Sequence, residues 1–108
     1  MIRLTPVEEQ VMLKLWQLEV ASVKEIIALY DDKKPAYNTT STIIRILEKK
    51  KFVKHKKSGR GFLYLPKISK TEYRNYLADW LLSNYFENDK KAYKNHFQLN
   101  SLDEILGN

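Results

Sequence analysis

Five consecutive residues with short hydrogen-bonding side chains, Asn38 to Thr42, stand directly ahead of an apolar pair at Ile43 and Ile44. Such side chains can bond to base edges or phosphate oxygens while the backbone comes close to them. Arg45 follows, and its forked guanidinium can bind a guanine edge or a phosphate. The stretch ends on Lys49, Lys50 and Lys51, which we assign to a phosphate backbone or to solvent. This pattern favours recognition of a polyanion by hydrogen bonds and charge.

Positive charge is concentrated around the same stretch. Between Lys33 and Gly61 there are ten lysines and arginines against one acid, Glu48, so this segment carries +9 in a chain whose formal net charge is +6. A basic block within an otherwise slightly acidic chain indicates a polyanion bound at one place. The alternative interpretation is a solvated face without a partner.

Composition excludes several function classes. The chain has no cysteine, which excludes disulfides and thiolate metal sites and suits a reducing cytoplasm. No apolar run approaches the ~18 residues of a membrane span, and the N-terminus is not a signal peptide, so we expect a cytoplasmic protein without membrane contact. Neither His55 nor His96 has a nucleophile motif or a metal-binding partner at suitable spacing. We therefore expect no catalytic residue, no cofactor and no metal.

Helix starts are marked by a hydroxyl residue followed three positions later by glutamate, the capping-box pattern. It occurs at Thr5, Ser22, Ser69 and Ser101. Apolar spacing extends the first three of these into helices, and a further helix and a short turn complete the C-terminal part. The predicted spans are 6–18, 23–30, 70–85 and 89–97, with the turn after residue 101.

The polar stretch belongs to one more helix, which runs from residue 36 or 38 to about residue 50. At 100° per residue, Thr40 falls on the inward face, whereas Ser41 and Arg45 fall on the polar face. Asn38 is also a candidate for the N-cap of this helix. Threonine is a mediocre helix former, so three of them in about one turn favour a contact role.

Residues 52–66 alternate between apolar and polar positions around a Ser-Gly-Arg-Gly turn, which predicts a β-hairpin that ends at Pro66. Three helices followed by a hairpin are typical of a winged helix-turn-helix, whose third helix enters the DNA major groove. The predicted fold is mainly α with a small β-hairpin. We expect a winged-helix DNA-binding domain over 1–67 and a C-terminal helical dimerisation region over 68–108.

The two C-terminal helices carry an aromatic stripe that is larger than the hairpin and the first helix need. One small module binds DNA weakly, and a second copy on a second half-site adds affinity and enforces spacing. We therefore expect a homodimer, the alternative being that these side chains close the core of the single chain. The candidate interface residues are Tyr76, Leu77, Trp80, Leu81, Tyr85, Tyr93 and Phe97.

The segments LTPVEEQVMLKLW, SVKEI and KPAYNTTSTIIRILEKKKFVKHKKSGRGFLYLPKISKTEY resemble the penicillinase-repressor (BlaI/MecI/CopY) family of bacterial winged-helix repressors, over residues 4 to about 73. The resemblance implies a homodimer that binds a palindromic double-stranded DNA operator and represses nearby genes. It maps the recognition-helix motif onto Tyr37, Asn38, Thr39, Thr40, Thr42 and Arg45. It maps the wing onto Lys57, Gly59 and Arg60, and we add Lys56 and Ser58 because side chains at a hairpin turn can reach phosphates.

Three departures from the family pattern matter. Lys51 stands where a glycine is expected, so the preceding helix is expected to end differently. From residue 88 onward the match is poor, and His96 separates Asn95 from Phe97 at the bond that is cleaved in some relatives. A regulatory protease is therefore an open question, and thiolate metal sensing is excluded. A winged-helix protein-interaction module and a non-specific nucleic-acid binder remain the alternative functions.

Overall fold

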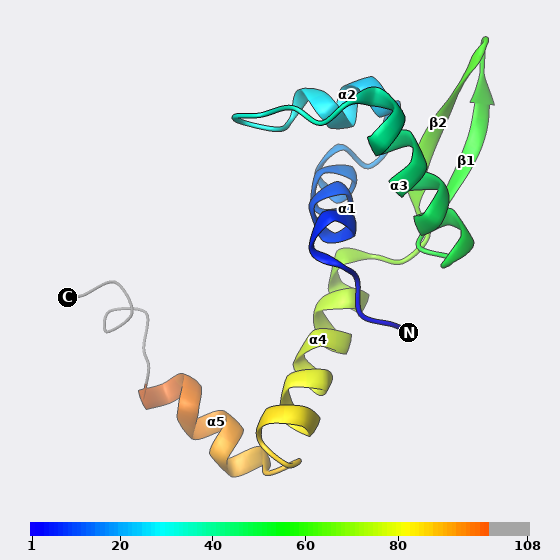
Figure 1. Ribbon diagram of the computed structural model, residues 1–108. Coiled ribbons are helices and arrows are strands. Elements are labelled where there is room, and N and C mark those ends of the chain that lie inside the picture. Colours follow the sequence, from blue (N-terminus) through cyan, green and yellow to red (C-terminus); the bar gives the residue numbers. More distant parts are fainter. Residues whose placement is uncertain (100–108) are drawn as a thin grey trace. The chain divides into compact units, whose positions relative to one another are not determined.

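The computed structural model describes residues 1–99 of the chain (Figure 1). Its mainly helical fold has a two-stranded antiparallel hairpin after the third helix, which confirms the predicted winged-helix class. The elements in chain order are α1 (Pro6–Leu18), α2 (Val23–Ala28), α3 (Tyr37–Lys49), β1 (Val53–Ser58), β2 (Gly61–Pro66), α4 (Lys70–Tyr85) and α5 (Lys90–Leu99). The turn predicted after residue 101 lies outside the described residues.

Capping boxes start the helices as predicted at three of the four positions. The Glu8 carboxylate accepts a hydrogen bond from the Thr5 N–H at 2.8 Å, and the Thr5 hydroxyl accepts one from the Glu8 N–H at 3.3 Å. The same reciprocal pair forms at Ser22 and at Ser69. These bonds satisfy backbone donors that a helix start leaves without a partner. The fourth box, at Ser101, lies outside the described residues.

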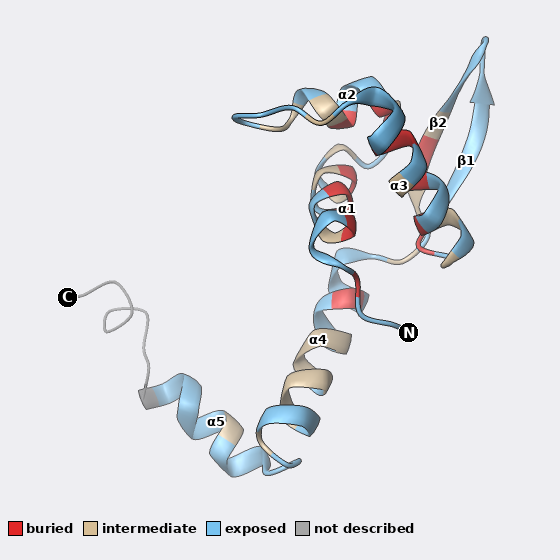
Figure 2. Cartoon of the chain, in the orientation of Figure 1, coloured by how far each residue is buried: buried red, intermediate tan, exposed pale blue. Residues whose placement is uncertain are grey.

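The chain divides into two compact units, residues 1–73 and residues 74–108. The first unit contains α1, α2, α3 and the hairpin around one apolar core, which Figure 2 shows in red on their inner faces. Burial of this apolar core is the main contribution to the stability of the first unit, at about 25 cal/mol for each Å² of apolar surface removed from water. The buried apolar residues are Leu4, Val11, Met12, Leu15, Ala21, Val23, Ile26, Ile44, Leu47, Phe52, Val53, Tyr64 and Tyr73.

The hairpin is held in register by its turn and by a third segment of chain. Strands β1 and β2 pair from Val53 opposite Pro66 to Ser58 opposite Gly61. Gly59, the first of the two turn residues, has a φ of 59°, and two-residue hairpin turns need such positive values. Ala21 exchanges two backbone hydrogen bonds with Tyr64 of β2, at 3.0 and 2.8 Å. The hairpin is thereby fixed to the link between α1 and α2.

Helix α3 ends in a Schellman motif. The Phe52 N–H donates to the Leu47 carbonyl at 2.9 Å, and the Lys51 N–H donates to the Glu48 carbonyl at 3.0 Å. Lys51 has a φ of 66°, in the left-handed region that glycine enters more easily. The expectation that lysine here would change the helix end is therefore wrong, because Lys51 itself adopts the conformation that glycine favours.

The first unit includes the first turn of α4, which the sequence assigned to the C-terminal region. The Tyr73 hydroxyl accepts a hydrogen bond from the Leu4 N–H at 2.8 Å, and the ring of Tyr73 packs edge-on against Phe52 at 5.7 Å. The Trp16 indole N–H donates to the Ile68 carbonyl at 2.8 Å. These long-range bonds tie the start of α4 to the N-terminal segment and to α1.

The second unit has a different character, because no side chain from residue 74 to residue 98 is buried. Its aromatic rings contact near neighbours along the chain, such as Phe86 with Tyr93 at 5.2 Å and Tyr93 with Phe97 at 5.0 Å. Tyr85 and Phe97 are 66% and 52% exposed. Apolar surface on these helices therefore remains largely in contact with water.

Candidate nucleic-acid interface

The outward face of α3 carries polar side chains that point to solvent. Tyr37, Asn38, Thr39, Thr42 and Arg45 are all exposed. The N-cap of the helix is Ala36, whose side chain makes no capping hydrogen bond, so the interpretation of Asn38 as N-cap is wrong. Backbone N–H groups in the first turn consequently have no side-chain cap and can bond to an anion.

Thr40, which the resemblance maps to the recognition motif, is buried instead. It is 0% exposed, and its hydroxyl donates to the Ala36 carbonyl at 3.1 Å. A residue in this position cannot touch a partner that lies on the outer face. Thr40 is therefore a core residue that steadies the start of α3, as its inward helical position predicted.

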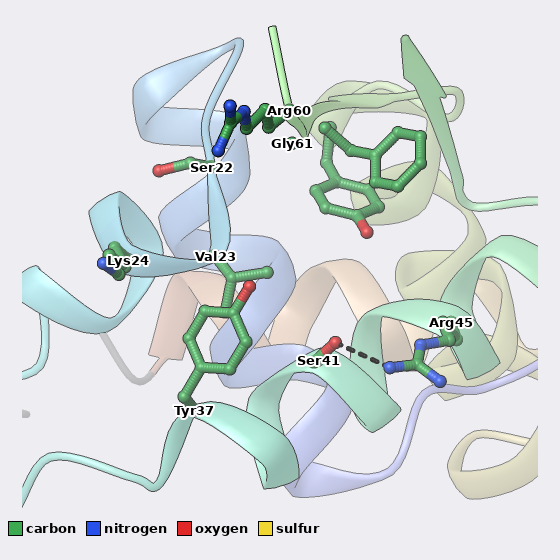
Figure 3. Close-up of a pocket in the computed structure, with 10 residues that line it drawn as sticks. Ser22, Val23, Lys24, Tyr37, Ser41, Arg45, Arg60 and Gly61 are labelled. Carbon is green, nitrogen blue, oxygen red and sulfur yellow. Dashed lines mark hydrogen bonds between the residues drawn. The ribbon is translucent and has the colours of Figure 1, made fainter. Parts of the chain in front are cut away.

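Ser41 was predicted on the polar face and is only 7% exposed. Its hydroxyl accepts a hydrogen bond from a terminal nitrogen of Arg45 at 3.1 Å, one helical turn further along (Figure 3). Because an arginine side chain has many rotamers, this bond fixes the position of the guanidinium before any partner arrives. The i, i+4 spacing of the two residues is the sequence signal that could have revealed the pair.

Glu48 connects α3 to the hairpin. Its carboxylate makes a short contact with the Nδ1 atom of His55 on β1, and the His55 ring packs edge-on against Phe62 on β2 at 5.0 Å. Glu48 thus contacts His55 on β1, and the structure gives Arg45 the hydroxyl of Ser41 as its hydrogen-bond partner. The sequence contained no local signal for this pairing.

Lys50 and Lys34 have structural partners that the sequence did not predict. The Lys50 ammonium lies 2.6 Å from the Glu8 carboxylate and links α3 to α1. Burial on its own would raise the pKa of Glu8, but hydrogen bonds from Lys50 and Thr5 outweigh it and hold the pKa below its usual range. Lys34 donates to the Tyr30 carbonyl at 2.8 Å, just after the end of α2. The expectation that Lys50 faces solvent or DNA is therefore wrong.

The hairpin turn presents the predicted wing residues to solvent. Lys56, Lys57, Ser58, Gly59 and Arg60 are all exposed. In Figure 1 the turn lies at the far end of the hairpin from its junction with α3. Side chains at such a tip are free to approach a surface that also contacts the outer face of α3.

A cleft of about 450 Å³ lies between the start of α2, α3 and the hairpin (Figure 3). It brings Lys24 of α2 together with Arg45 and Arg60. No carboxylate lines it among the residues that the structure describes. At its floor, burial and then the nearby charge of Glu48 raise the pKa of the Tyr64 phenol. The lining residues are Ser22, Val23, Lys24, Tyr37, Ser41, Arg45, Arg60, Gly61, Phe62 and Tyr64.

Lys24, Phe62 and Ser41 complete this surface and were not among the predicted site residues. Lys24 reaches it because the segment before α2 pairs with β2, a contact between residues far apart in the sequence. The exposed outer face of α3, the cationic cleft and the wing together form one surface that can bind a long anion.

Residues 4–105 match the family model described as Penicillinase repressor. The chain belongs to the penicillinase repressor family. The match extends beyond residue 73, into the part where the motifs alone agreed poorly. Proteins of the penicillinase repressor family are DNA-binding transcriptional repressors and in general not enzymes. A comparison with curated proteins found no match.

Two further observations concern residues 1–99. None of the helices there is long and apolar enough to cross a membrane. That part of the chain also contains no cluster of three or more histidine, aspartate or glutamate side chains arranged to hold a metal ion.

Proposed function

We propose that this penicillinase repressor family member binds a palindromic DNA operator as a homodimer in the bacterial cytoplasm, with α3 in the major groove and the hairpin on the phosphate backbone. The observation that carries the proposal is the single surface formed by α3, the cleft and the wing. Its exposed side chains are short polar groups, cations and the aromatic rings of Tyr37 and Phe62, and no carboxylate lines the cleft within the described chain.

The outer face of α3 has the side chains that a groove-reading helix needs. The major groove is about 12 Å wide and admits one helix, provided that the side chains facing the bases are short. Asn38 and Thr39 fit this requirement. Thr42 does as well, and because its hydroxyl donates to the Asn38 carbonyl at 2.9 Å, its methyl group and acceptor lone pairs are left for bases. Arg45 supplies the long arm, and Tyr37 lies at the edge of the face.

The wing supplies contacts that do not depend on sequence. Lys56 and Lys57 carry charge to the hairpin turn, and Arg60 adds a guanidinium within it. The Ser58 hydroxyl and the backbone N–H of Gly59 can also bond to phosphate oxygens. We assign the whole tip to the DNA backbone.

The second unit is the proposed dimer interface. At 100° per residue, Leu77, Leu81, Tyr85 and Leu82 form one broad apolar side of α4, and Trp80 and Tyr76 extend it further round the helix. A helix with so wide an apolar surface is normally buried. In the single chain none of these side chains is buried. A second copy of the chain would cover them, and two copies would also present two reading heads to DNA. The proposed interface comprises Tyr76, Leu77, Trp80, Leu81, Tyr85, Tyr93 and Phe97.

The test is a selection of bound sequences from random duplex DNA at ~150 mM salt, a concentration that weakens purely electrostatic binding. We expect enrichment of an inverted repeat whose half-sites lie about one helical turn apart, or a multiple of it. Equal recovery of all sequences, with binding that disappears as salt rises, would contradict the proposal and leave a non-specific basic module.

A further inference from the structure

Cations from three separate elements line the cleft beside α3. Lys24 lies in the first turn of α2, Arg45 lies on α3, and Arg60 lies in the hairpin turn, and all three line the same space. Each is exposed and none makes an ion pair within the described part of the chain. Like charges that are gathered without a carboxylate repel one another, and a bound anion removes that repulsion.

The size of the cleft indicates more than an isolated phosphate. Its volume of about 450 Å³ falls within the range in which small-molecule sites occur, roughly 300–1,000 Å³. A sugar attached to the phosphate would occupy the remaining space. This comparison favours one nucleotide unit over a simple anion.

The walls also suit a sugar. Phe62 lines the cleft and is 48% exposed, and the ring of His55 packs edge-on against it with the ring centroids 5.0 Å apart. Tyr37 lies on the α3 side and is 51% exposed. An exposed aromatic ring that is held by a neighbour offers a rigid apolar face, and tyrosine side chains commonly contact the phosphate and sugar of DNA.

We propose that this cleft holds one nucleotide unit of the DNA backbone, with its phosphate contacted by Lys24 and Arg60 and its deoxyribose packed against Phe62. The inference rests on the proposed function. The helix before the recognition helix generally crosses the DNA backbone, and the inference names Lys24 and Phe62 as the side chains that contact it here. A backbone unit held between the reading helix and the wing would fix the register of α3 in the groove.

The first experiment compares two lysine variants on the selected operator. Lys24→Gln removes charge from the cleft, and the control Lys67→Gln removes the same charge from a separate cavity beside Trp16. Both lysines are exposed, so both variants should keep the thermal stability of the unchanged protein. We expect Lys24→Gln to weaken binding roughly tenfold per half-site on every duplex, and to reduce the salt slope by about one. Equal effects of the two variants would overturn the proposal.

The second experiment identifies the phosphate. Single methylphosphonate linkages, which are uncharged, are placed one at a time along the operator. We expect one position in each half-site to weaken binding of the unchanged protein but not of Lys24→Gln, because the lost contact is the same one. Additive effects at every position would contradict the assignment. Phe62→Leu should weaken binding without changing the salt slope, since it removes no charge.

The third experiment separates a DNA phosphate from a free nucleotide. Thymidine monophosphate and inorganic phosphate are titrated against the whole protein, with amide chemical shifts as the readout. Millimolar binding that shifts cleft residues agrees with a weak backbone contact. Micromolar binding of the free nucleotide, with operator affinity unaffected by Lys24→Gln, would reassign the cleft to a small-molecule ligand. Failure of the unchanged protein to bind any duplex would instead overturn the proposed function together with this inference.

Discussion

Residues 1–73 and residues 74–99 differ in how far their apolar side chains are buried. The first unit buries thirteen apolar residues, whereas the second buries none up to residue 98. Both have large aromatic residues at helical spacing, so composition does not explain the difference. Long-range bonds do: the Tyr73 hydroxyl accepts a hydrogen bond from the distant Leu4 N–H, whereas the rings of Tyr93 and Phe97 contact each other within one helix. The first unit therefore completes its own core, and the second is expected to complete one with another molecule.

The largest expected effect tests whether the first unit is held by its own core. Phe52 is 2% exposed and packs between the end of α3 and Tyr73. Phe52→Ala should lower the free energy of unfolding by about 3–5 kcal/mol, because it removes apolar contact and leaves a cavity. Tyr85→Ala, at a largely exposed position of the second unit, should change unfolding of the first unit by less than about 0.5 kcal/mol. Urea unfolding followed by Trp16 fluorescence, with Trp80→Phe present in every variant, measures both, and similar losses would contradict the comparison.

The next effect tests whether the second unit needs a second chain. Leu81→Asp places a charge on the apolar side of α4 and should raise the dimer dissociation constant at least ~30-fold, since a central interface side chain contributes about 2 kcal/mol or more. Ser83→Asp adds the same charge at an exposed position of the same helix and should have little effect. Sedimentation equilibrium gives the constants. A chain that stays monomeric at millimolar concentration before any substitution would refute the dimer.

A smaller expected effect distinguishes residues that contact DNA from residues that form the dimer. Arg45→Ala should lower operator affinity by about 1–3 kcal/mol and relax discrimination at one base position. Lys57→Ala should weaken all duplexes alike and reduce the salt slope by about one for each half-site. Neither change lies in the second unit, so both should leave the dimer constant unaltered. Affinity measurements on operator and random duplexes test both expectations. An equal loss of affinity for all duplexes with Arg45→Ala would mean that Arg45 contacts a phosphate rather than a base.

The sequence predicted what depends on neighbours in the chain. The bounds of α1 and α4, three capping boxes and the turn at Gly59 follow from local patterns that the structure confirms. Helix α2 ends at Ala28 rather than near residue 30, because Leu29 and Tyr30 bond three residues back in tighter turns. In α1 the apolar side chain of Val7 is exposed, whereas the charged side chain of Glu8 is buried. Local patterns alone did not indicate which face of α1 would meet Lys50.

The cationic cleft shows the same limit for the site. Thr39, Thr42 and Arg45 are exposed, and helical spacing predicted Arg45 on the polar face. Lys24 joins them only because Ala21 pairs with Tyr64, and Ser41 turns inward to bond Arg45. Such pairings depend on contacts between distant segments, and a single sequence does not encode them in any local pattern.

Low pH should lower the free energy of unfolding of the first unit, because the Glu8 carboxylate becomes protonated. The pKa of this carboxyl is lowered in the folded chain, so its stabilising contribution is complete above the unfolded value of about 4.3. That contribution is lost as pH falls through the folded pKa, because the proton then binds more readily to the unfolded chain. Glu8→Gln should be less stable than the unchanged protein by about 1–2 kcal/mol at pH 6, and the gap should shrink towards pH 3. Urea unfolding at both pH values tests this, and a constant gap would contradict it.

The smallest expected effect concerns Lys51, whose positive φ closes α3. A left-handed conformation strains a side chain with a Cβ atom by about 1–2 kcal/mol, and glycine avoids that strain but has more conformational freedom to lose on folding. The difference predicts that Lys51→Gly raises the free energy of unfolding by about 0.5 kcal/mol. Lys49→Gly, inside the last turn of the helix, should lower it by about 1 kcal/mol instead. Thermal and urea unfolding of the two variants give the signs. Destabilisation by Lys51→Gly would mean that the lysine side chain contributes more to the end of α3 than its backbone strain removes.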